Sequence, residues 1–597
     1  MLPLKSDYCT AILDERGMAV PGAAPAAGIY RHDTRHLSRY VWRFADLGLI
    51  HAEADATTLV QYWSRLRRHR QEVLVERRLM LTPTGFEEQF RIESWSDAPL
   101  ALDIALEAEA DFIDIFEARG HRRQAPAHAV TRMADGFAYV AQDGISSATR
   151  IVAESGFGSA PLELAPREVA ERRVVVHFDT TLPAAAGAAA AAWAPRVDRQ
   201  GLDAEAGRAL ERALADLGAL LLTTPQGPMI AAGIPNFVVP FGRDSLISAW
   251  LLLDADPGLA RAVLRYLAAH QGTKVDPFRD EEPGKILHEH RESELSRIGE
   301  LPFRTYYGSA DSTPLFVIVL ADYVARTGDG ALARALEANW RAALGWMATY
   351  SDARGLINFR QRQDGKGLTV QSWKDSSDSM SYGDGTPAEG GLAVAEVQGY
   401  AFAAFQAAAL LSAACDGPAE EQRNWRSRAA TLAETFDRLY WMEQHDTYAL
   451  ALDEAGRQLD VNASDSGHLL WSGIVPEGKA GRVIARLFAS DMWSGYGLRT
   501  LSSRERLYNP LSYHNGSVWP HDTAIFAAGL RRYGDAAGFA RVREALVALA
   551  CRSADRRLPE LVGGYARDGG TPPLPYVESC RPQAWAAAAL VYVLGKL

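Results

Sequence analysis

The stretch DSLISAWLLLDADPGLARAVLRYLAAH, residues 244–270, contains the unit that decides the fold of the larger part of the chain. Apolar residues recur at helical spacing on both sides of the short connection 255–258, where Pro and Gly mark a turn. This pattern predicts two helices joined as a hairpin. It recurs throughout residues 201–597 and predicts about twelve helices, over Asp203–Leu222, Asp244–Asp254, Leu259–His270, Ser312–Thr327, Ala331–Tyr350, Gly391–Ala414, Glu420–Tyr440, Gly467–Trp471, Lys479–Ala489, Val518–Tyr533, Ala536–Arg552 and Pro582–Leu597.

The connections between these predicted helices alternate between short and long. The long ones are rich in Trp, Tyr, Phe and His, and they cover 223–243, 271–311, 351–390, 441–466, 490–517 and 553–581. Long loops of this composition are expected to be ordered and functional. In an up-down ring of helices, alternate connections emerge on the same face, so we expect a toroid of six hairpins whose long loops converge on one cavity. The alternative is a helical array whose long loops only cover the helix ends.

Residues 1–182 have a different pattern. Short, often alternating apolar segments separated by turn residues, such as Glu72–Leu81 and Gly85–Trp95, predict an antiparallel β-sandwich. The Ala-rich stretch LPAAAGAAAAAWAPR (182–196) predicts a linker. The predicted domains are the β-sandwich at 1–182, the linker at 183–200 and the helical domain at 201–597.

Composition limits the classes of partner. The net charge of −11 argues against nucleic acid or an anionic membrane. We find no apolar run near the ~20 residues that a membrane span needs, and the start MLPLKSDYCTAILDERG has no apolar signal segment. The four cysteines show no CxxC spacing, which argues against a zinc site or a disulfide framework. These features predict a cytoplasmic protein.

The long loops carry polar and aromatic clusters suited to sugar. Trp and Tyr rings can lie against the C–H faces of a pyranose while Arg and carboxylate groups bind its hydroxyls. The sequence has no Gly-rich phosphate loop, Ser-His-Asp elbow or HExxH helix. The clusters are AGIPNFVVPFGRDS (232–245), GKILHEHRESE (284–294), YYGSADSTP (306–314), QSWKDSSDSM (371–380), EVQGY (396–400), NASDSGHLLWSG (462–473), MWSGYGLRTLS (492–502), YNPLSYHNGSVWPHD (508–522), LPELVGGY (558–565) and CRPQAW (580–585).

Two carboxyls stand out among many candidates for the hydrolysis of a glycosidic bond, which normally needs one protonated and one ionised carboxyl. Asp375 adjoins Trp373, whose apolar ring can raise the pKa of this carboxyl and keep it protonated. Glu560 follows a proline in the last long loop. The alternatives are Asp378 as the acid and Glu396 as the base.

In combination, these motifs resemble the C-terminal amylo-α-1,6-glucosidase domain of glycogen debranching enzymes. GIYRHDTRHLSRY (28–40) and DFIDIFEARG (111–120) resemble the N-terminal sandwich of a bacterial branch of those proteins. Residues 1–182 are too few for the transferase barrel of the bifunctional eukaryotic enzyme, because such a barrel needs about 250 residues. Only the glucosidase part is therefore expected, and the natural substrate need not be glycogen.

The resemblance implies an (α/α)6 barrel and an inverting glycoside hydrolase. It implies that Asp375 is the general acid and Glu560 the general base, with carboxyls roughly 6.5–9.5 Å apart, and that Arg243 and Asp244 bind the hydroxyls of the terminal glucose. It further places in the wall of the pocket His288, Glu289, Arg291, Asp311, Trp373, Lys374, Gln398, Trp471, Trp519, His521 and Gln583.

Other interpretations of two clusters stay open. His288 and His290 with the neighbouring glutamates are residue types that can bind a metal. Hydrogen bonding to sugar or bracing of the loop fits their spacing better, so no metal is predicted. Asp33, Thr34 and Arg35 are candidates to touch substrate at the mouth of the barrel, but an Arg that braces the two domains is the preferred interpretation.

The main hypothesis is an exo-acting enzyme that releases terminal α-linked glucose, from a trimmed glucan branch or from a smaller glucoside such as trehalose or a glucosylglycerate. No cofactor is required, because two carboxyls suffice. A glycoside phosphorylase, in which phosphate replaces the base, and a non-catalytic glycan-binding protein are the rivals. The linkage, the aglycone and the oligomeric state are not determined by the sequence.

Overall fold

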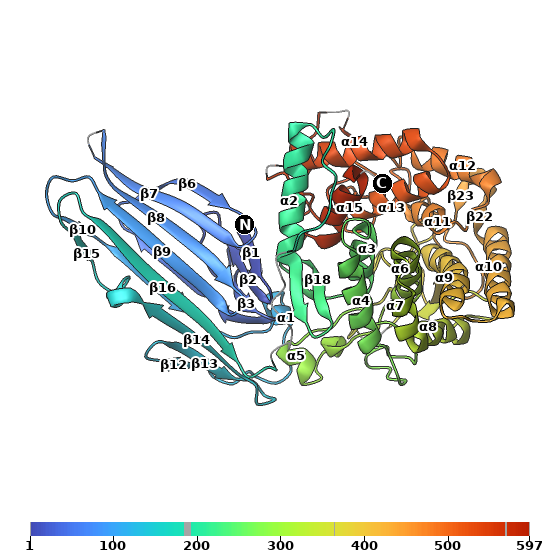
Figure 1. Ribbon diagram of the computed structural model, residues 1–597, viewed down its shortest axis with the longest axis horizontal. Helices are drawn as coiled ribbons and strands as arrows, with labels where there is room; N and C mark the ends of the chain where they lie inside the picture. The colour runs from blue at the N-terminus through green and yellow to red at the C-terminus, as the bar shows by residue number, and fades with distance from the viewer. Residues whose placement is uncertain are drawn as a thin grey trace.

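The computed structural model describes residues 2–24, 26–67, 69–183, 193–362, 365–553, 555–567 and 570–595. A sheet-rich N-terminal domain lies beside a helical C-terminal domain (Figure 1). The fold is therefore mixed β and α, as predicted. Half of the predicted linker, residues 184–192, lies outside the described residues.

The N-terminal domain consists of antiparallel strands with one short helix. Its larger sheet has the order β12-β13-β14-β16-β9-β8-β7-β6, and its smaller sheet, β1-β2-β3-β4, contacts strands β8 and β14 of the larger one. The strands are β1 Leu2–Ser6, β2 Cys9–Leu13, β3 Gly28–Arg31, β4 Thr34–Leu37, β5 Arg39–Phe44, β6 Gly48–Ala54, β7 Thr58–Arg67, β8 Arg70–Thr82, β9 Gly85–Ser94, β10 Leu100–Leu102, β11 Ile104–Glu109, β12 Thr131–Met133, β13 Gly136–Val140, β14 Ser146–Ala153, β15 Leu162–Leu164 and β16 Val169–Thr180. Helix α1 is Ile115–Ala118.

Alternating burial explains why these segments form a layered core. In β8 and β9, successive side chains switch between buried and exposed, as expected when one face of a strand packs inward. Trp63, Phe86 and Phe90 are almost fully buried in the apolar cluster of this domain.

The helical domain contains all the helices predicted from apolar periodicity; Ser312–Thr327 and Ala536–Arg552 have the predicted bounds, and the others have shifted ends. The helices are α2 Ala204–Leu220, α3 Arg243–Leu251, α4 Pro257–Ala269, α6 Ser312–Thr327, α7 Gly330–Ala335, α8 Glu337–Thr349, α9 Ala395–Ala414, α10 Ala419–Tyr440, α11 Asp465–Ser472, α12 Glu477–Leu487, α13 Pro520–Arg532, α14 Ala536–Arg552 and α15 Ala584–Leu594. The segment predicted as one helix over Ala331–Tyr350 is divided into α7 and α8 at Leu336. The predicted end at Leu597 lies outside the described residues.

Contacts between helices form a closed ring in the described part of the chain. Helix α3 contacts α6, and the contacts continue through α9, α11, α13 and α15 back to α3. Every residue of α3, α11 and α15 is buried. Helices that are apolar or buried on all sides form the interior of a domain, whereas α10, with only four buried residues, lies outside this ring.

Several predicted loops contain short elements instead of irregular chain. The connection 223–243 includes β18 and β19, and these pair with β17, which begins directly after α2, to form the small sheet β17-β18-β19. A second small sheet, β20-β21-β24, joins the connections 351–390 and 441–466 through β21, which occupies the first four residues of the predicted helix Gly391–Ala414. The elements are β17 Leu221–Thr224, β18 Gly227–Gly233, β19 Phe237–Pro240, α5 Glu294–Arg297, β20 Phe359–Arg360, β21 Gly391–Val394, β22 Trp441–Met442, β23 Thr447–Tyr448 and β24 Ala451–Asp453. Single 3₁₀ turns lie at Glu154–Gly156, Pro302–Arg304 and Glu443–His445.

Helix α9 corrects one expectation from the sequence. By length and composition, its residues Ala395–Ala414 are apolar enough to cross a membrane, so the statement that no such run exists was wrong. In the structure, α9 contacts α6, α10 and α11 and buries most of its surface, including Glu396 and Gln398. Its apolar composition is that of a helix in the core of the domain.

The two domains are joined by hydrogen bonds that meet on α5. Buried Glu294 accepts hydrogen bonds from Arg123 at 3.1 Å, from the Tyr139 hydroxyl at 2.8 Å and from the Gln142 N–H at 3.0 Å, all in the N-terminal domain. Three hydrogen bonds to one buried carboxylate hold the two domains in a defined orientation. Helix α1 lies at this junction (Figure 1).

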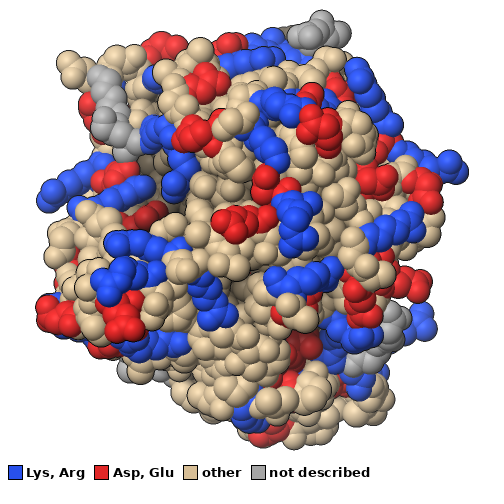
Figure 2. Space-filling view, turned by 90° about the vertical axis from the view of Figure 1, so that its right-hand side faces the viewer, with Lys and Arg blue, Asp and Glu red and all other residues tan. Residues whose placement is uncertain are grey.

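The face of the helical domain that points away from the N-terminal domain carries both signs of charge (Figure 2). Basic and acidic side chains are interspersed there, and ion pairs such as Lys479–Asp437, at 2.7 Å, lie on α10 and α12. This face therefore presents mixed charge rather than a field of one sign.

Candidate active site

A cavity of about 560 Å³ lies where the long connections of the helical domain meet α1 of the N-terminal domain. Five of the six long connections contribute to its described lining, and the connection 441–466 does not. The lining residues are Phe116, Arg119, His121, Asn236, Phe237, Phe241, Arg243, Asp244, His288, Glu289, Arg291, Phe303, Leu368, Trp373, Asp375, Tyr513, His514, Trp519, Glu560, Tyr576, Glu578 and Trp585.

Arg243 holds the predicted acid Asp375 in place. It is the first residue of α3, and the preceding Gly242 packs so closely that an added Cβ would lie 2.0 Å from the Leu287 carbonyl oxygen. The Arg243 guanidinium donates to Asp375 Oδ2 at 2.6 Å and to the Ser372 carbonyl at 2.8 Å. Thus Arg243, which we expected to bind sugar hydroxyls, donates its hydrogen bonds mainly to acceptors within the protein.

Two opposing effects set the pKa of Asp375. Burial raises the pKa of this carboxyl above its ordinary value, and the charge and hydrogen bond of Arg243 lower it. The sequence argument expected the raised pKa but attributed it to Trp373. The indole N–H of Trp373 donates to Asp465 at 3.1 Å, and its ring packs against Trp519, so burial by the whole cavity is the cause.

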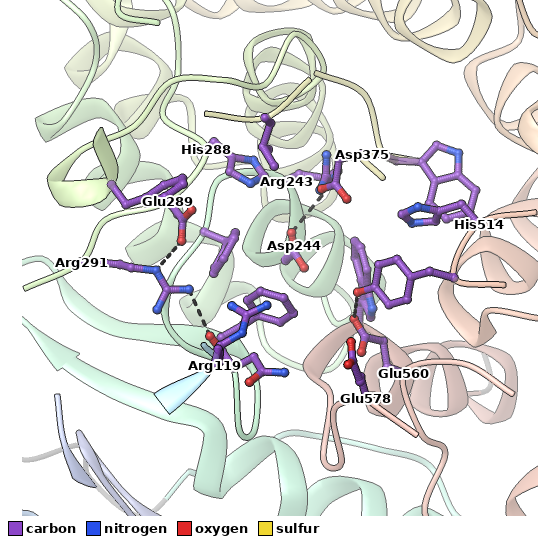
Figure 3. A pocket seen from close by; sticks show the side chains of 18 of the residues that line it. Arg119, Arg243, Asp244, His288, Glu289, Arg291, Asp375, His514, Glu560 and Glu578 are labelled. Atoms are coloured by element: carbon purple, nitrogen blue, oxygen red, sulfur yellow. Dashed lines mark hydrogen bonds and ion pairs between the residues drawn. The ribbon is translucent and has the colours of Figure 1, made fainter. Parts of the chain in front are cut away.

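Glu560 lies on another wall of the same cavity (Figure 3). Its Oε1 accepts a hydrogen bond from the Tyr513 hydroxyl at 2.7 Å, and its Oε2 accepts one from the Cys580 N–H at 2.8 Å. Burial raises the pKa of Glu560 to about 7, those two hydrogen bonds oppose the rise, and the charge of Asp375 adds to it. A carboxyl with this pKa can accept a proton near neutral pH.

Asp244 lies between Asp375 and Glu560 in the view of Figure 3. Burial raises the pKa of Asp244 to about 7, with Arg243 opposing. Within the described residues, Asp244 Oδ2, His288 Nδ1 and the indole nitrogen of Trp585 are buried and have no hydrogen-bond partner. All three residues line the cavity, and buried polar groups normally find a partner, so a hydroxyl-rich ligand would satisfy them.

The rest of the inner wall is aromatic and neutral. His514 stacks on Trp519 with ring centroids 5.1 Å apart, and Trp373 meets Trp519 edge-on at 5.8 Å. Burial lowers the pKa of His288 and of His514 well below the ordinary value, so both rings are uncharged near pH 7. Flat rings with polar edges suit a pyranose.

Another part of the cavity wall is formed by ion pairs, one of which joins the two domains. Arg291 contacts Glu289 at 2.5 Å and Asp33 of the N-terminal domain at 3.0 Å. This motif therefore does brace the two domains, but through Asp33 and not through the arginine that was predicted to do so. Arg35 instead pairs with Asp111 inside its own domain.

Several predicted wall residues lie behind the cavity rather than on it, and they support the residues that line it. Asp311 pairs with Arg243 at 3.2 Å, and Lys374 pairs with Asp465 at 2.5 Å. Gln398 bonds the backbone of Ile357. The others in this second layer are Trp471, His521 and Gln583.

These six residues miss the cavity for a common reason. Their motifs lie in the right loops, but the side chains point into the packed interior. His521, for example, stacks on the far side of the cavity residue Trp585 with centroids 3.6 Å apart. Trp471 packs against Trp250 and Tyr400.

The alternative catalytic residues are not part of the cavity lining. Asp378 is exposed and accepts a hydrogen bond from Asn515 at 3.2 Å. Glu396 is fully buried at the start of α9, where burial raises the pKa of its carboxyl. His290 bonds the Tyr266 hydroxyl at 2.8 Å, and the described residues contain no group of three metal-ligating side chains.

Part of the cavity lining was not predicted from the sequence. Tyr513, His514 and Trp585 stand inside quoted motifs but were not selected, because aromatic residues at these positions are equally suited to a core. Phe116 and Arg119 stand inside the quoted motif DFIDIFEARG of the other domain, and no pattern in the sequence indicated that α1 reaches the helical domain.

Comparisons with known proteins agree with this two-domain organisation. Residues 243–564 match the mannosylglycerate hydrolase MGH1-like glycoside hydrolase domain, and residues 4–200 match the N-terminal domain of some glycogen debranching enzymes. Among curated proteins, none matches the chain.

Solved structures from Thermus thermophilus resemble part of the chain at low identity. The GH63 mannosylglycerate hydrolase in complex with glucose is 17% identical over 61% of this chain and 95% of that chain, with a TM-score of 0.46. The same hydrolase with Tris and D-glycerate is 16% identical over 65% and 98%, also with a TM-score of 0.46. An uncharacterized conserved protein is 16% identical over 61% and 95%, with a TM-score of 0.45.

The match at residues 243–564 covers more than half of the chain and contains both Asp375 and Glu560. The chain therefore belongs to the mannosylglycerate hydrolase MGH1-like glycoside hydrolase family and carries an N-terminal domain of the glycogen debranching type.

Proposed function

We propose that this glycoside hydrolase is an inverting, exo-acting enzyme that releases terminal α-linked glucose from a small glucoside. The observation that carries the proposal is the pair Asp375 and Glu560 on separate walls of one cavity, both with a pKa raised by burial. The ring of helix contacts from α3 to α15 supports an (α/α)6 barrel as the scaffold, and the two contacting sheets support a sandwich for the N-terminal domain.

In the proposed reaction, protonated Asp375 donates its proton to the glycosidic oxygen as the bond from that oxygen to the anomeric carbon breaks. Ionised Glu560 takes a proton from a water molecule whose oxygen forms the new bond to the anomeric carbon from the opposite face. Arg243 orients Asp375 through the 2.6 Å hydrogen bond. Tyr513 and the Cys580 N–H orient Glu560.

Cavity size favours a small substrate. About 560 Å³ is within the range of roughly 300–1,000 Å³ that is typical of small-molecule sites. Helix α1 and the segment around Tyr576 and Glu578 contribute to the wall on the open side, which restricts the room for a long glucan.

Amylo-α-1,6-glucosidase activity is the second candidate. The match of residues 4–200 to the N-terminal domain of some glycogen debranching enzymes favours it. A branched limit dextrin is therefore a necessary member of any substrate panel.

Proton NMR of freshly released sugar tests the proposal. The panel contains α-glucosides of glycerate and of glycerol, trehalose, isomaltose and a glucosyl-branched limit dextrin, each with and without phosphate, and the corresponding α-mannosides. Early β-glucose from a small glucoside is the expected result. Early α-glucose would overturn the acid–base scheme, release that requires phosphate would indicate a phosphorylase, and release of mannose alone would show that the sugar is assigned wrongly.

A further inference from the structure

The N-terminal domain contributes directly to the cavity. Phe116, Arg119 and His121, in and just after α1, line it together with residues of the helical domain. They lie outside the segment 243–564 that matches the glycoside hydrolase family. Whatever these side chains recognise is therefore specific to chains that carry this N-terminal domain.

Helix α1 is held firmly against the helical domain. Asp114 caps α1 by accepting from the Phe116 N–H at 2.9 Å, and its other oxygen accepts from the Leu295 N–H at 3.0 Å across the domain boundary. The ring of Phe116 stacks on Phe303 with centroids 5.1 Å apart. Because the contacts with Leu295 and Phe303 fix α1 against the helical domain, the following residue Arg119 has a defined place on the wall.

Arg119 differs from the other two arginines of the cavity. Arg243 pairs with three carboxylates and Arg291 with two. Within the described part of the chain, Arg119 has no side-chain hydrogen bond and no carboxylate within 4.0 Å, and its guanidinium lies 5.6 Å from the ring centroid of Phe237. Figure 3 shows it between Arg291 and Glu560. Desolvation by the surrounding protein and the like charge of Arg291 lower the pKa of Arg119.

Arg119 lies on the side of the cavity that would hold the leaving group, the part of the substrate released on cleavage. Trp373, Trp519 and Arg243, at the closed end of the cavity, are 1–3% exposed. Arg119 and Glu578 are exposed at the open end. An exo-acting enzyme places the terminal sugar at the closed end, so the group released on cleavage lies toward Arg119.

We propose that Arg119 selects substrates whose leaving group carries a carboxylate or a phosphate, so that the N-terminal domain completes the specificity site. The inference rests on the proposed exo-hydrolysis. A guanidinium binds such groups with two parallel charge-assisted hydrogen bonds, and neutral sugar hydroxyls gain much less from its charge.

Matched substrates and variants test this assignment. The substrates are α-glucosides of glyceric acid, glycerol phosphate and glycerol, which differ only in the charged group. The variants are Arg119→Gln, Arg119→Lys and, as the control, Arg122→Gln, which removes the same charge from an exposed residue of the same segment that does not line the cavity. The readout is kcat/KM, with binding of each glucoside measured by calorimetry.

We expect Arg119→Gln to lower kcat/KM about 10- to 100-fold for the two charged glucosides, the range for losing a hydrogen bond to a charged group, and less than about threefold for the glycerol glucoside. Arg119→Lys should recover part of the loss, and Arg122→Gln should match the wild type. A larger loss for one anion identifies the leaving group as carboxylate or phosphate.

An equal loss on charged and neutral glucosides would overturn the inference, as would a wild-type preference for the glycerol glucoside. If the wild type cleaves none of the three, the proposed function fails separately. Calorimetry then still decides on Arg119, because equal binding of the charged and neutral glucosides by the wild type would refute the role of Arg119.

Discussion

Replacing Tyr513 by Phe should shift the acidic limb of the pH–rate profile to higher pH. The Tyr513 hydroxyl donates a 2.7 Å hydrogen bond to Glu560 Oε1, and this bond lowers the pKa of a carboxyl that burial raises to about 7. A general base acts in its ionised form, so the rate rises as pH increases through that pKa. Without the donor, the ionised form is less stable and its pKa rises further. Phe retains the ring that packs against Trp519 at 4.9 Å.

The size of the shift follows from the single bond that is lost. A hydrogen bond to a charged group contributes about 1.5–3 kcal/mol, and one pKa unit corresponds to about 1.4 kcal/mol. The upper limit is therefore roughly two units, and water that enters the open cavity can replace part of the bond. We expect a shift of about one unit, and thus a loss of about tenfold in kcat/KM well below pH 7 and little loss well above it.

The assay is kcat/KM for a cleaved glucoside between about pH 5 and pH 9, since this constant reports the pKa of the free enzyme. Tyr508→Phe is the control, because the Tyr508 hydroxyl bonds the Gly564 carbonyl at 3.1 Å and does not line the cavity. An unshifted limb, or one that moves to lower pH, would refute the assignment of Glu560 as the base. A uniform loss at every pH would mean that Tyr513 binds substrate only.

Other substitutions test the remaining parts of the site and the domain joint. Asp375→Asn and Glu560→Gln should each lower kcat at least about 10²-fold with little change in the unfolding midpoint, and near wild-type turnover in both would show that the pair is assigned wrongly. Asp378→Asn should stay within about threefold of the wild type, because Asp378 is exposed outside the cavity; a loss as large as that of Asp375→Asn would make Asp378 the acid. Glu294→Gln should destabilise the protein by about 3 kcal/mol, since a buried carboxylate with three donors is lost; an unchanged midpoint in urea would contradict the role of this joint.

The helices could be predicted because apolar residues recur at helical spacing over most of their length. Helices such as α10 and α12 place apolar residues on one stripe, and α15 is apolar on all sides because each of its residues is buried. The short strands β17 to β19 were read as loop, because apolar runs of four to seven residues beside Gly and Pro do not distinguish a strand from irregular chain.

The site could be predicted as a set of loops but not as a set of side chains. Trp373 and Lys374 are neighbours in one motif, yet Trp373 lines the cavity and Lys374 points back to Asp465. Which of two neighbours faces a cavity depends on backbone rotation inside an irregular loop, and no periodicity encodes that rotation. Arg119 adds a second kind of limit, because its place depends on the docking of another domain.

Each proposed catalytic carboxyl is controlled by a residue that is distant in the sequence. Arg243 from the start of α3 lowers the pKa of Asp375, and Tyr513 from the loop before α13 lowers that of Glu560, against the same opposing effect of burial. The protonated Asp375 and the ionised Glu560 that the proposed reaction needs therefore depend on the folded domain and not on either sequence motif alone. If the leaving-group side of the cavity is likewise set by Arg119, the residue after α1, then the helical domain determines the chemistry and the N-terminal domain determines which leaving group is accepted. Substitutions at Tyr513 should then change the pH dependence without changing the preference for charge, and substitutions at Arg119 should do the reverse.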